Sequence, residues 1–441
     1  MALNANERSD LLSAKTRGGY RESADLWRLQ CGPLLDRSDP VGGLWFIEWD
    51  CKRIVLRCCY EGCTLASVTK FGRYSMKPTT DKPALSNLDE IDARIATAEA
   101  NGLIRLSPIS ANLGVEVTGV DLKSQLSPEQ VAVVYEALIR HKVLVFKKIG
   151  LNHEQQVRFT YELSGVSQNV GGPTIGHTVF GHVDQYPEIF SVYQGEKSKP
   201  RNMERYEAKA TTHPWTGYHC DITACVNPPS IGMLRGDVIP EGVGDTNFGN
   251  LAVAYETLDE DTKAQLATLQ AEHEYKYGKT TGTQAGDSIA SRKMVSHHPL
   301  VTVHPDTGEK ILFNSPAFLK FVVGMSDEDS SALLHKIWQH SVEYTIQHVW
   351  DQGDLVVWDE RSTTHRAPTD IYSKGTERQL YRTTLVGQPL HGVDGRVSQI
   401  VEGEPMLSCE EELASQMHVG RTGSSITGNG FGGAFAEPSQ S

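Results

Sequence analysis

The feature that most constrains the fold is a series of short strand-like segments bounded by turn residues and not separated by regularly spaced helices. Residues 103–120 alternate in polarity and carry Gly114 and Gly119, which is typical of two short strands with turns. Further apolar runs predict strands at 142–146, 231–235, 300–303, 311–313, 344–350, 354–358 and 378–386. A parallel α/β sheet would need a helix between successive strands. The pattern therefore predicts a mainly β protein with flanking helices, whose strands close on themselves as a jelly-roll barrel.

Capping residues mark the starts of three helices. Ser127 with Gln130, and Asn152 with Gln155, have the spacing of a capping box, and Ser326 precedes an acidic first turn. We expect the first of these helices to reach about Arg140 and the third about His340, with a further helix over 255–270 and long loops over 168–215.

Composition divides the 441 residues into four segments. Residues 1–75 lack periodicity and are expected to be a poorly ordered N-terminal appendage, followed by a flexible leader at 76–102. The main domain is expected at 103–400, and the Gly/Ser-rich tail at 401–441 is expected to be largely disordered. Five of the eight cysteines precede residue 64 without the paired spacing of a zinc site, so we expect free thiols there.

Charge and hydropathy limit the partners. A net charge of −13 argues against nucleic acid, because phosphate binding needs a basic surface. No apolar run is long enough for a membrane span, and the acidic N-terminus lacks a signal core. We therefore expect a cytoplasmic protein with a small-molecule ligand, and the sequence leaves open whether it forms a homo-oligomer.

The triplet formed by His219, Cys220 and Asp221 is the main candidate for chemistry. In an extended strand, residues two apart point to the same face, so His219 and Asp221 could bind one ion together. Two histidines and one carboxylate are the ligands of non-haem Fe(II) oxygenases, and His365 is the candidate third ligand. Two other His-x-Asp triplets begin at His182 and His304, and we expect these two histidines to be surface or hydrogen-bonded residues.

Five motifs follow one another along the chain. They are 218–223 (Tyr-His-Cys-Asp-Ile-Thr), 228–229 (Pro-Pro), 244–246 (Gly-Asp-Thr), 358–366 (Trp-Asp-Glu-Arg-Ser-Thr-Thr-His-Arg) and 378–382 (Arg-Gln-Leu-Tyr-Arg). In this order and spacing they resemble the taurine/2,4-dichlorophenoxyacetate dioxygenase (TauD/TfdA) family, over about 103–389. The resemblance implies a double-stranded β-helix (jelly-roll, cupin-like) core that uses Fe(II), 2-oxoglutarate and O2.

The resemblance also implies residue roles. His219, Asp221 and His365 match the family's iron ligands. Thr246 and Arg378 match the residues that hold the distal carboxylate of 2-oxoglutarate, whereas Arg382 matches the arginine near its other carboxylate and the substrate anion.

The spacing of the two arginines agrees with these roles. On a strand, Arg378 and Arg382 share a face, with their Cα atoms about 13 Å apart. A dicarboxylate lying along the strand could engage one arginine at each end, because the guanidinium fork matches a carboxylate.

Two positions depart from the taurine enzymes and affect the expected substrate. The stretch after the second helix contains Asn169 and Pro173 but no His-Pro pair, and Trp215 replaces a polar residue four positions before His219. We expect Asn169 and Trp215 to contact the substrate, with Phe180 adding an apolar wall. These departures argue against taurine itself as the substrate.

The predicted reaction is oxidation of a C–H bond of a small organic anion, such as a sulfonate, an amino acid or another carboxylate, with release of succinate and CO2. Oxidative cyclisation or desaturation in natural-product biosynthesis is an alternative, and a non-enzymatic metal-binding cupin-like module is a remote one. A halogenase is disfavoured because Asp221 retains its carboxylate.

Arg361 and Arg366 are expected in ion pairs or at the surface, and Trp350 and Trp358 in the core.

Overall fold

The structure is a computed structural model that describes residues 45–50, 53–58, 86–174, 182–195, 203–275, 293–373 and 375–412. The chain divides into two compact units, Met1–Phe71 and Gly72–Ser441. In the first unit, β1 (Trp45–Asp50) and β2 (Arg53–Cys58) pair as an antiparallel hairpin. This hairpin lies within the expected poorly ordered appendage, and the remainder of that appendage lies outside the described residues.

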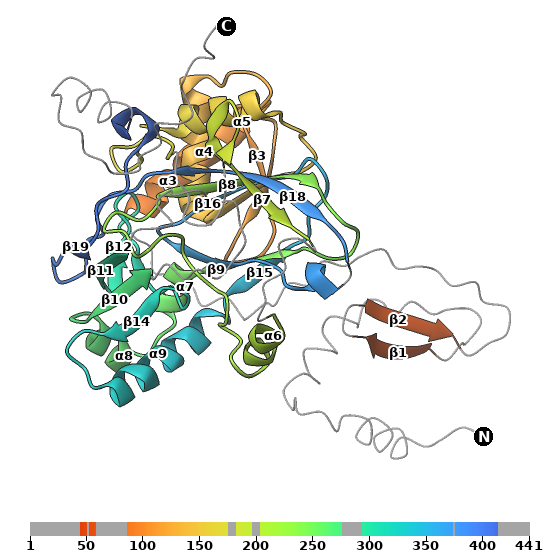
Figure 1. Cartoon of the computed structure of the whole chain (residues 1–441). Helices are drawn as coiled ribbons and strands as arrows, with labels where there is room; N and C mark the ends of the chain where they lie inside the picture. The colour runs from red at the N-terminus through yellow and green to blue at the C-terminus, as the bar shows by residue number, and fades with distance from the viewer. Residues whose placement is uncertain are drawn as a thin grey trace, which may run out of the picture. The chain divides into compact units, whose positions relative to one another are not determined.

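The second unit is built on an eight-stranded sheet with the order β3-β4-β5-β16-β8-β18-β7-β6 (Figure 1). All neighbours pair antiparallel except β4 and β5. The strands are β3 (Arg105–Pro108), β4 (Val115–Thr118), β5 (Val143–Phe146), β6 (His182–Val183), β7 (Tyr186–Gln194), β8 (Ile231–Val238), β16 (Leu355–Asp359) and β18 (Arg378–Leu385).

Strand β16 shows why both faces of this sheet are covered. Successive side chains of a strand point to opposite faces. Leu355 and Val357 belong to an apolar cluster with α3 (Ser86–Ala100), α4 (Pro128–His141) and α5 (His153–Leu163), which cover one face (Figure 1). Val356 and Trp358 belong to a second cluster on the opposite face.

A smaller sheet faces this second cluster. Its order is β15 (Thr345–His348), β9 (Thr246–Asn250), β17 (Thr363–Arg366), all antiparallel. Phe248 of β9 and Ile346 of β15 pack with Trp350 and Trp358, which confirms the two tryptophans as core residues. The two sheets are open, so the expectation that the strands close on themselves is corrected: apolar packing, rather than a continuous hydrogen-bonded barrel, joins them.

Residues between β9 and β15 form a further layer with its own core. A sheet with the order β14-β10-β11-β19 packs with helices through residues that include Leu266, Leu319 and Leu334. Its elements are α7 (Leu251–Glu256), α8 (Glu260–Leu266), β10 (Gln270–Tyr275), β11 (Met294–Pro299), β12 (Val301–Val303), β13 (Lys310–Leu312), β14 (Leu319–Val322), α9 (Asp327–Ser341) and the more distant β19 (Gln399–Glu402). The expected hairpin at 300–313 is confirmed as β12 paired with β13.

The capping signals predicted helix starts correctly. Both capping boxes are present, at the N-termini of α4 and α5, and the Ser326 side chain accepts from the backbone N–H of Asp329 at the start of α9. The helix expected over 255–270 is wrong in extent: α7 ends at Glu256, Asp259 caps a separate α8, and Gln270 already begins β10.

Three other expectations are corrected. The long loops expected over 168–215 contain strand β7 and helix α6 (Met203–Thr212). The expected leader contains α3, whose Ile91 and Ile95 are buried in the core beside α4. His219 lies not in a strand but in an isolated antiparallel bridge to His365. None of the helices in the described ranges is both long and apolar enough to span a membrane.

Candidate metal and cosubstrate site

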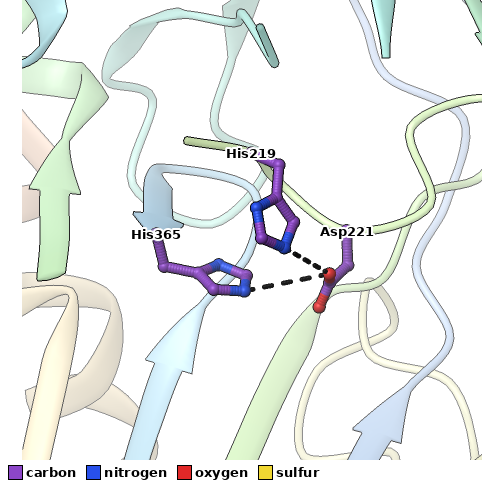
Figure 2. A group of neighbouring side chains, drawn as sticks. All are labelled: His219, Asp221 and His365. Carbon is purple, nitrogen blue, oxygen red and sulfur yellow. Dashed lines mark ion pairs between the residues drawn. The ribbon is translucent and has the colours of Figure 1, made fainter. Parts of the chain in front are cut away.

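His219, Asp221 and His365 converge on one point (Figure 2). His219 Nε2 lies 3.4 Å and His365 Nε2 3.8 Å from Asp221 Oδ1. One ligand atom from each residue lies within 4.8 Å of the other two. The two histidines are brought together by their backbones, because each N–H donates to the other's carbonyl at 2.8–2.9 Å. In the described part of the chain this is the only cluster of three or more such residues that could hold a metal ion.

The local backbone orients the two ligands that come from one segment. His219 Nδ1 lies 2.9 Å from the Gly217 carbonyl, which fixes the ring so that Nε2 faces Asp221. Gly217 has φ +85°, and a Cβ there would collide with the Tyr206 ring. Ile222 has φ +45°, which is rare for a β-branched residue and marks a strained turn directly after Asp221.

The protonation states of His365 and Asp221 suit a divalent ion. Burial, with the nearby His219, holds the pKa of His365 well below its usual value, so its imidazole is neutral. Burial alone would raise the pKa of Asp221, but the Arg382 guanidinium holds it well below the usual range. Neutral imidazoles and a carboxylate are the forms that bind metal. The donor set fits Fe(II) with open coordination positions.

Arg378 and Thr246 form a second polar site between the two sheets. Arg378 is 2% exposed, and its Nη2 donates to Thr246 Oγ1 at 3.1 Å and its Nη1 to Gln194 Oε1 at 2.7 Å. Its guanidinium lies over the Trp350 ring, 5.5 Å from the centroid. Among the described residues, no carboxylate forms an ion pair with Arg378, and burial lowers its pKa to about 9. A buried cation without a paired carboxylate is costly, so this site favours an anionic ligand.

Arg382 lies on the same face of β18, but its environment differs. Its Nη2 forms ion pairs with Asp221 Oδ2 and, at 2.8 Å, with Glu360 Oε1. Its Nε donates to Thr384 Oγ1 at 3.2 Å, and its guanidinium lies 4.9 Å from the centroid of the Trp358 ring. Arg382 therefore has two counter-charges within the protein itself.

Glu360 is a buried acidic residue of this site whose role the sequence did not predict. Its side chain is buried, its Oε1 also accepts from Trp358 Nε1 at 2.7 Å, and its Oε2 accepts from the Asp221 backbone N–H at 3.2 Å. Burial and the Asp221 charge raise the pKa of Glu360. The available signal was its position, since an acidic residue directly follows a buried strand and precedes His365 by five residues.

The expected substrate residues make other contacts. Asn169 Nδ2 donates to Asp306 Oδ1 at 3.0 Å, and none of its described contacts is with the triad. Trp215 is buried against α9. The centroid of its ring lies 5.3 Å from that of His335 and 6.3 Å from that of Trp338. Phe180 lies outside the described residues. The substrate roles of these residues stay predictions.

The histidines of the other two triplets lie outside the metal cluster. His182 is exposed, and His304 is buried with its Nε2 2.8 Å from Asp359 Oδ2. Arg361 pairs with Asp306 and Asp359, as expected of a structural ion pair, whereas Arg366 lies half-buried over the Tyr218 ring.

The two facing sheets and the His-Asp-His cluster define a class of protein, the non-haem iron oxygenases with two histidines and one carboxylate. More narrowly, the chain belongs to the taurine catabolism dioxygenase TauD, TfdA family, whose model matches residues 105–384. It is therefore an alpha-ketoglutarate (2-oxoglutarate)-dependent dioxygenase that uses Fe(II), 2-oxoglutarate and O2.

Relatives with assigned names support this membership. The chain is 32% identical over 331 residues to an alkylsulfatase of Acinetobacter baylyi, which covers 71% of this chain and 95% of that protein. It is 29% identical over 323 residues to an alpha-ketoglutarate-dependent sulfate ester dioxygenase of Pseudomonas putida, with coverages of 70% and 98%. The crystal structure of a taurine dioxygenase from Burkholderia xenovorans superposes with a TM-score of 0.58 at 41% identity, over 68% of this chain and 96% of that one.

Proposed function

We propose that this dioxygenase oxidises a C–H bond of a small organic anion, with release of succinate and CO2. Fe(II) is held by His219, Asp221 and His365, and the distal carboxylate of 2-oxoglutarate by Arg378 and Thr246. The observation that carries the cosubstrate assignment is the burial of Arg378 without an ion pair to any carboxylate in the described part of the chain. We also assign the two facing sheets to a double-stranded β-helix core.

Each residue has a separate task in this proposal. The bound iron supplies the redox chemistry with O2. Thr246 Oγ1 accepts from both Arg378 and the Trp350 indole, so it keeps the guanidinium in place before a carboxylate binds. Trp350 and Phe248 form an apolar wall that excludes water, which strengthens the charge interaction.

The substrate class is inferred from the relatives. The names of the matched proteins describe action on alkyl sulfates, sulfate esters and 2,4-dichlorophenoxyacetate, all of which are anions with an apolar body. A substrate of this kind has a sulfonate, sulfate or carboxylate head that approaches the Arg382 side of the site.

Cyclisation or desaturation has no specific observation in its favour. A non-enzymatic metal-binding module would need neither Arg378 nor Thr246.

The proposal is tested by succinate release over a panel of alkyl sulfates, sulfonates, amino acids and aryloxyalkanoates. We expect at least one apolar anion to couple 2-oxoglutarate consumption to its own oxidation, and taurine to be a poor substrate. If neutral analogues of every panel member were oxidised equally well, the anionic substrate class would be wrong.

The contribution of Arg382 is tested separately with Arg382→Gln. Uncoupled 2-oxoglutarate consumption and the substrate KM are both measured, for an anionic substrate and its neutral amide. A larger KM increase for the anion supports a contact between Arg382 and the substrate head, whereas equal losses assign Arg382 to the cosubstrate and the metal ligand alone.

A further inference from the structure

Glu360 contacts the metal ligand Asp221 by two routes. Directly, Oε2 accepts the backbone N–H of Asp221 at 3.2 Å. Indirectly, Oε1 holds Arg382 Nη2 at 2.8 Å, and the same nitrogen pairs with Asp221 Oδ2. The backbone and the side chain of one ligand are thereby attached to a single buried carboxyl group.

The two oxygens of Asp221 have different neighbours. Oδ1 faces the Nε2 atoms of His219 and His365, whereas Oδ2 faces Arg382. A carboxylate that binds a metal through one oxygen needs its second oxygen held, because rotation about the side chain would exchange the two. The guanidinium on Oδ2 leaves Oδ1 for the ion.

The place of Arg382 is itself fixed from Glu360. The Trp358 indole donates to the same Oε1 at 2.7 Å and lies under the guanidinium. Gly232, opposite Trp358 in β8, makes room for this arrangement, because a Cβ there would lie 2.8 Å from Oε1 and would collide with the indole. Glu360 therefore lies in a packed position with little freedom to move.

We propose that Glu360 is a positioning residue for the metal site: it holds Arg382 and the Asp221 backbone so that Asp221 Oδ1 is presented to the ion. The inference rests on the proposed function in one respect, that these three ligands bind the iron. Outer partners of metal ligands typically contribute roughly 10- to 100-fold to metal affinity.

The test is a double-mutant cycle of Glu360 and Arg382. The quantity measured is the affinity for Mn²⁺ in the absence of 2-oxoglutarate and substrate. We expect Glu360→Ala to weaken Mn²⁺ binding by roughly 10- to 100-fold. In the Arg382→Gln background the same change should cost clearly less, because part of its effect passes through Arg382. Glu360→Gln keeps an oxygen that accepts from Trp358 and Arg382, so it should restore part of the affinity.

Two outcomes would overturn the inference. Unchanged affinity in Glu360→Ala would remove any role, and equal losses in both backgrounds would mean that Glu360 does not act on the metal site through Arg382. Asp306→Asn is the matched control, because Asp306 pairs with the neighbouring Arg361 and has no described contact with the triad. If Glu360→Ala does not fold, the cycle is run with Glu360→Gln. A loss of Mn²⁺ affinity that is the same with Arg382 and with Arg382→Gln again contradicts the proposal.

Failure of the proposed function gives a different result. If the His219→Ala variant binds Mn²⁺ as tightly as the unchanged protein, the three ligands do not form the metal site. If His219→Ala removes binding but the cycle is additive, only the role of Glu360 is lost.

Discussion

At the residue scale, Arg378 and Arg382 lie on one face of β18 but differ in charge environment. Arg382 is paired with Asp221 and Glu360. Among the described residues, Arg378 hydrogen-bonds to the neutral Thr246 and Gln194 and forms no ion pair, while Asp245 and Asp370 act on its charge from a greater distance. Burial of an unpaired cation costs free energy that an arriving carboxylate recovers. We therefore propose that Arg378 binds the cosubstrate, whereas Arg382 also orients Asp221.

We expect Arg378→Lys to raise the KM for 2-oxoglutarate strongly. An ammonium group replaces a planar fork that can bind a carboxylate through two parallel hydrogen bonds. Loss of one charge-assisted bond is worth roughly 1.5–3 kcal/mol, or about 10- to 150-fold. Steady-state succinate release at varied 2-oxoglutarate measures this change, and an unchanged KM would assign the carboxylate to another residue.

The sequence predicted the residues of the candidate site but not all of their contacts. His219, Asp221, His365, Thr246 and Arg378 were recognised because each belongs to a motif with fixed spacing. The pairing of Glu360 with Arg382 could not be predicted, since it joins residues 22 positions apart in sequence, and the partner of a buried charge depends on the tertiary fold.

At the element scale, local signals predicted where helices begin better than where strands lie. A capping box depends on residues three apart, so Ser127 and Gln130 were sufficient. Strand β7 was missed because it contains Pro187 and mixes polar and apolar residues; its position is set by pairing with β18. The sequence also predicted a strand at His219. Only the single bridge between His219 and His365 forms there, because the chain turns at Asp221.

Strand β11 carries a buried histidine whose protonation opposes folding. His298 lies between the Thr223 carbonyl and Ser398 Oγ, each 2.7 Å from a ring nitrogen, and burial lowers its pKa from 6.5 to about 4. The unfolded chain therefore takes up this proton at higher pH than the folded protein. The contribution of His298 to the free energy of unfolding is therefore fully present above about pH 6.5 and is lost as the pH falls toward 4, by at most about 3 kcal/mol.

We expect His298→Gln to flatten this part of the pH dependence. The measurement is the urea midpoint of unfolding between pH 4 and 7 in both proteins. The variant starts from a lower midpoint at neutral pH, because two buried hydrogen bonds are perturbed. Its midpoint should fall less on acidification, and an identical slope in the two proteins would contradict the assignment.

At the scale of the whole molecule, the chain has a catalytic unit and a separate N-terminal unit. The catalytic unit begins near Gly72, and helix α3 belongs to it through Ile91, Ile95 and an ion pair between Asp92 and Arg140. Sequence periodicity placed the start of the main domain later, because α3 has a weak apolar stripe and follows a Pro-rich stretch.

We expect a protein that starts at Met76 to keep its fold and activity, whereas one that starts at Leu103 is markedly less stable. Only the second truncation exposes the apolar residues of α4 that α3 covers. Thermal unfolding and succinate release compare the two proteins. Loss of solubility on starting at Met76 would mean that residues 1–75 belong to the catalytic fold.

The central claim is that His219, Asp221 and His365 bind one iron. Anaerobic Fe(II) titration of the unchanged protein, Asp221→Ala and His182→Ala tests it most directly. We predict one ion per chain for the unchanged protein and His182→Ala, and a large loss of affinity together with loss of succinate release for Asp221→Ala. Undiminished Fe(II) binding by Asp221→Ala, or an equal loss in both variants, would contradict the account.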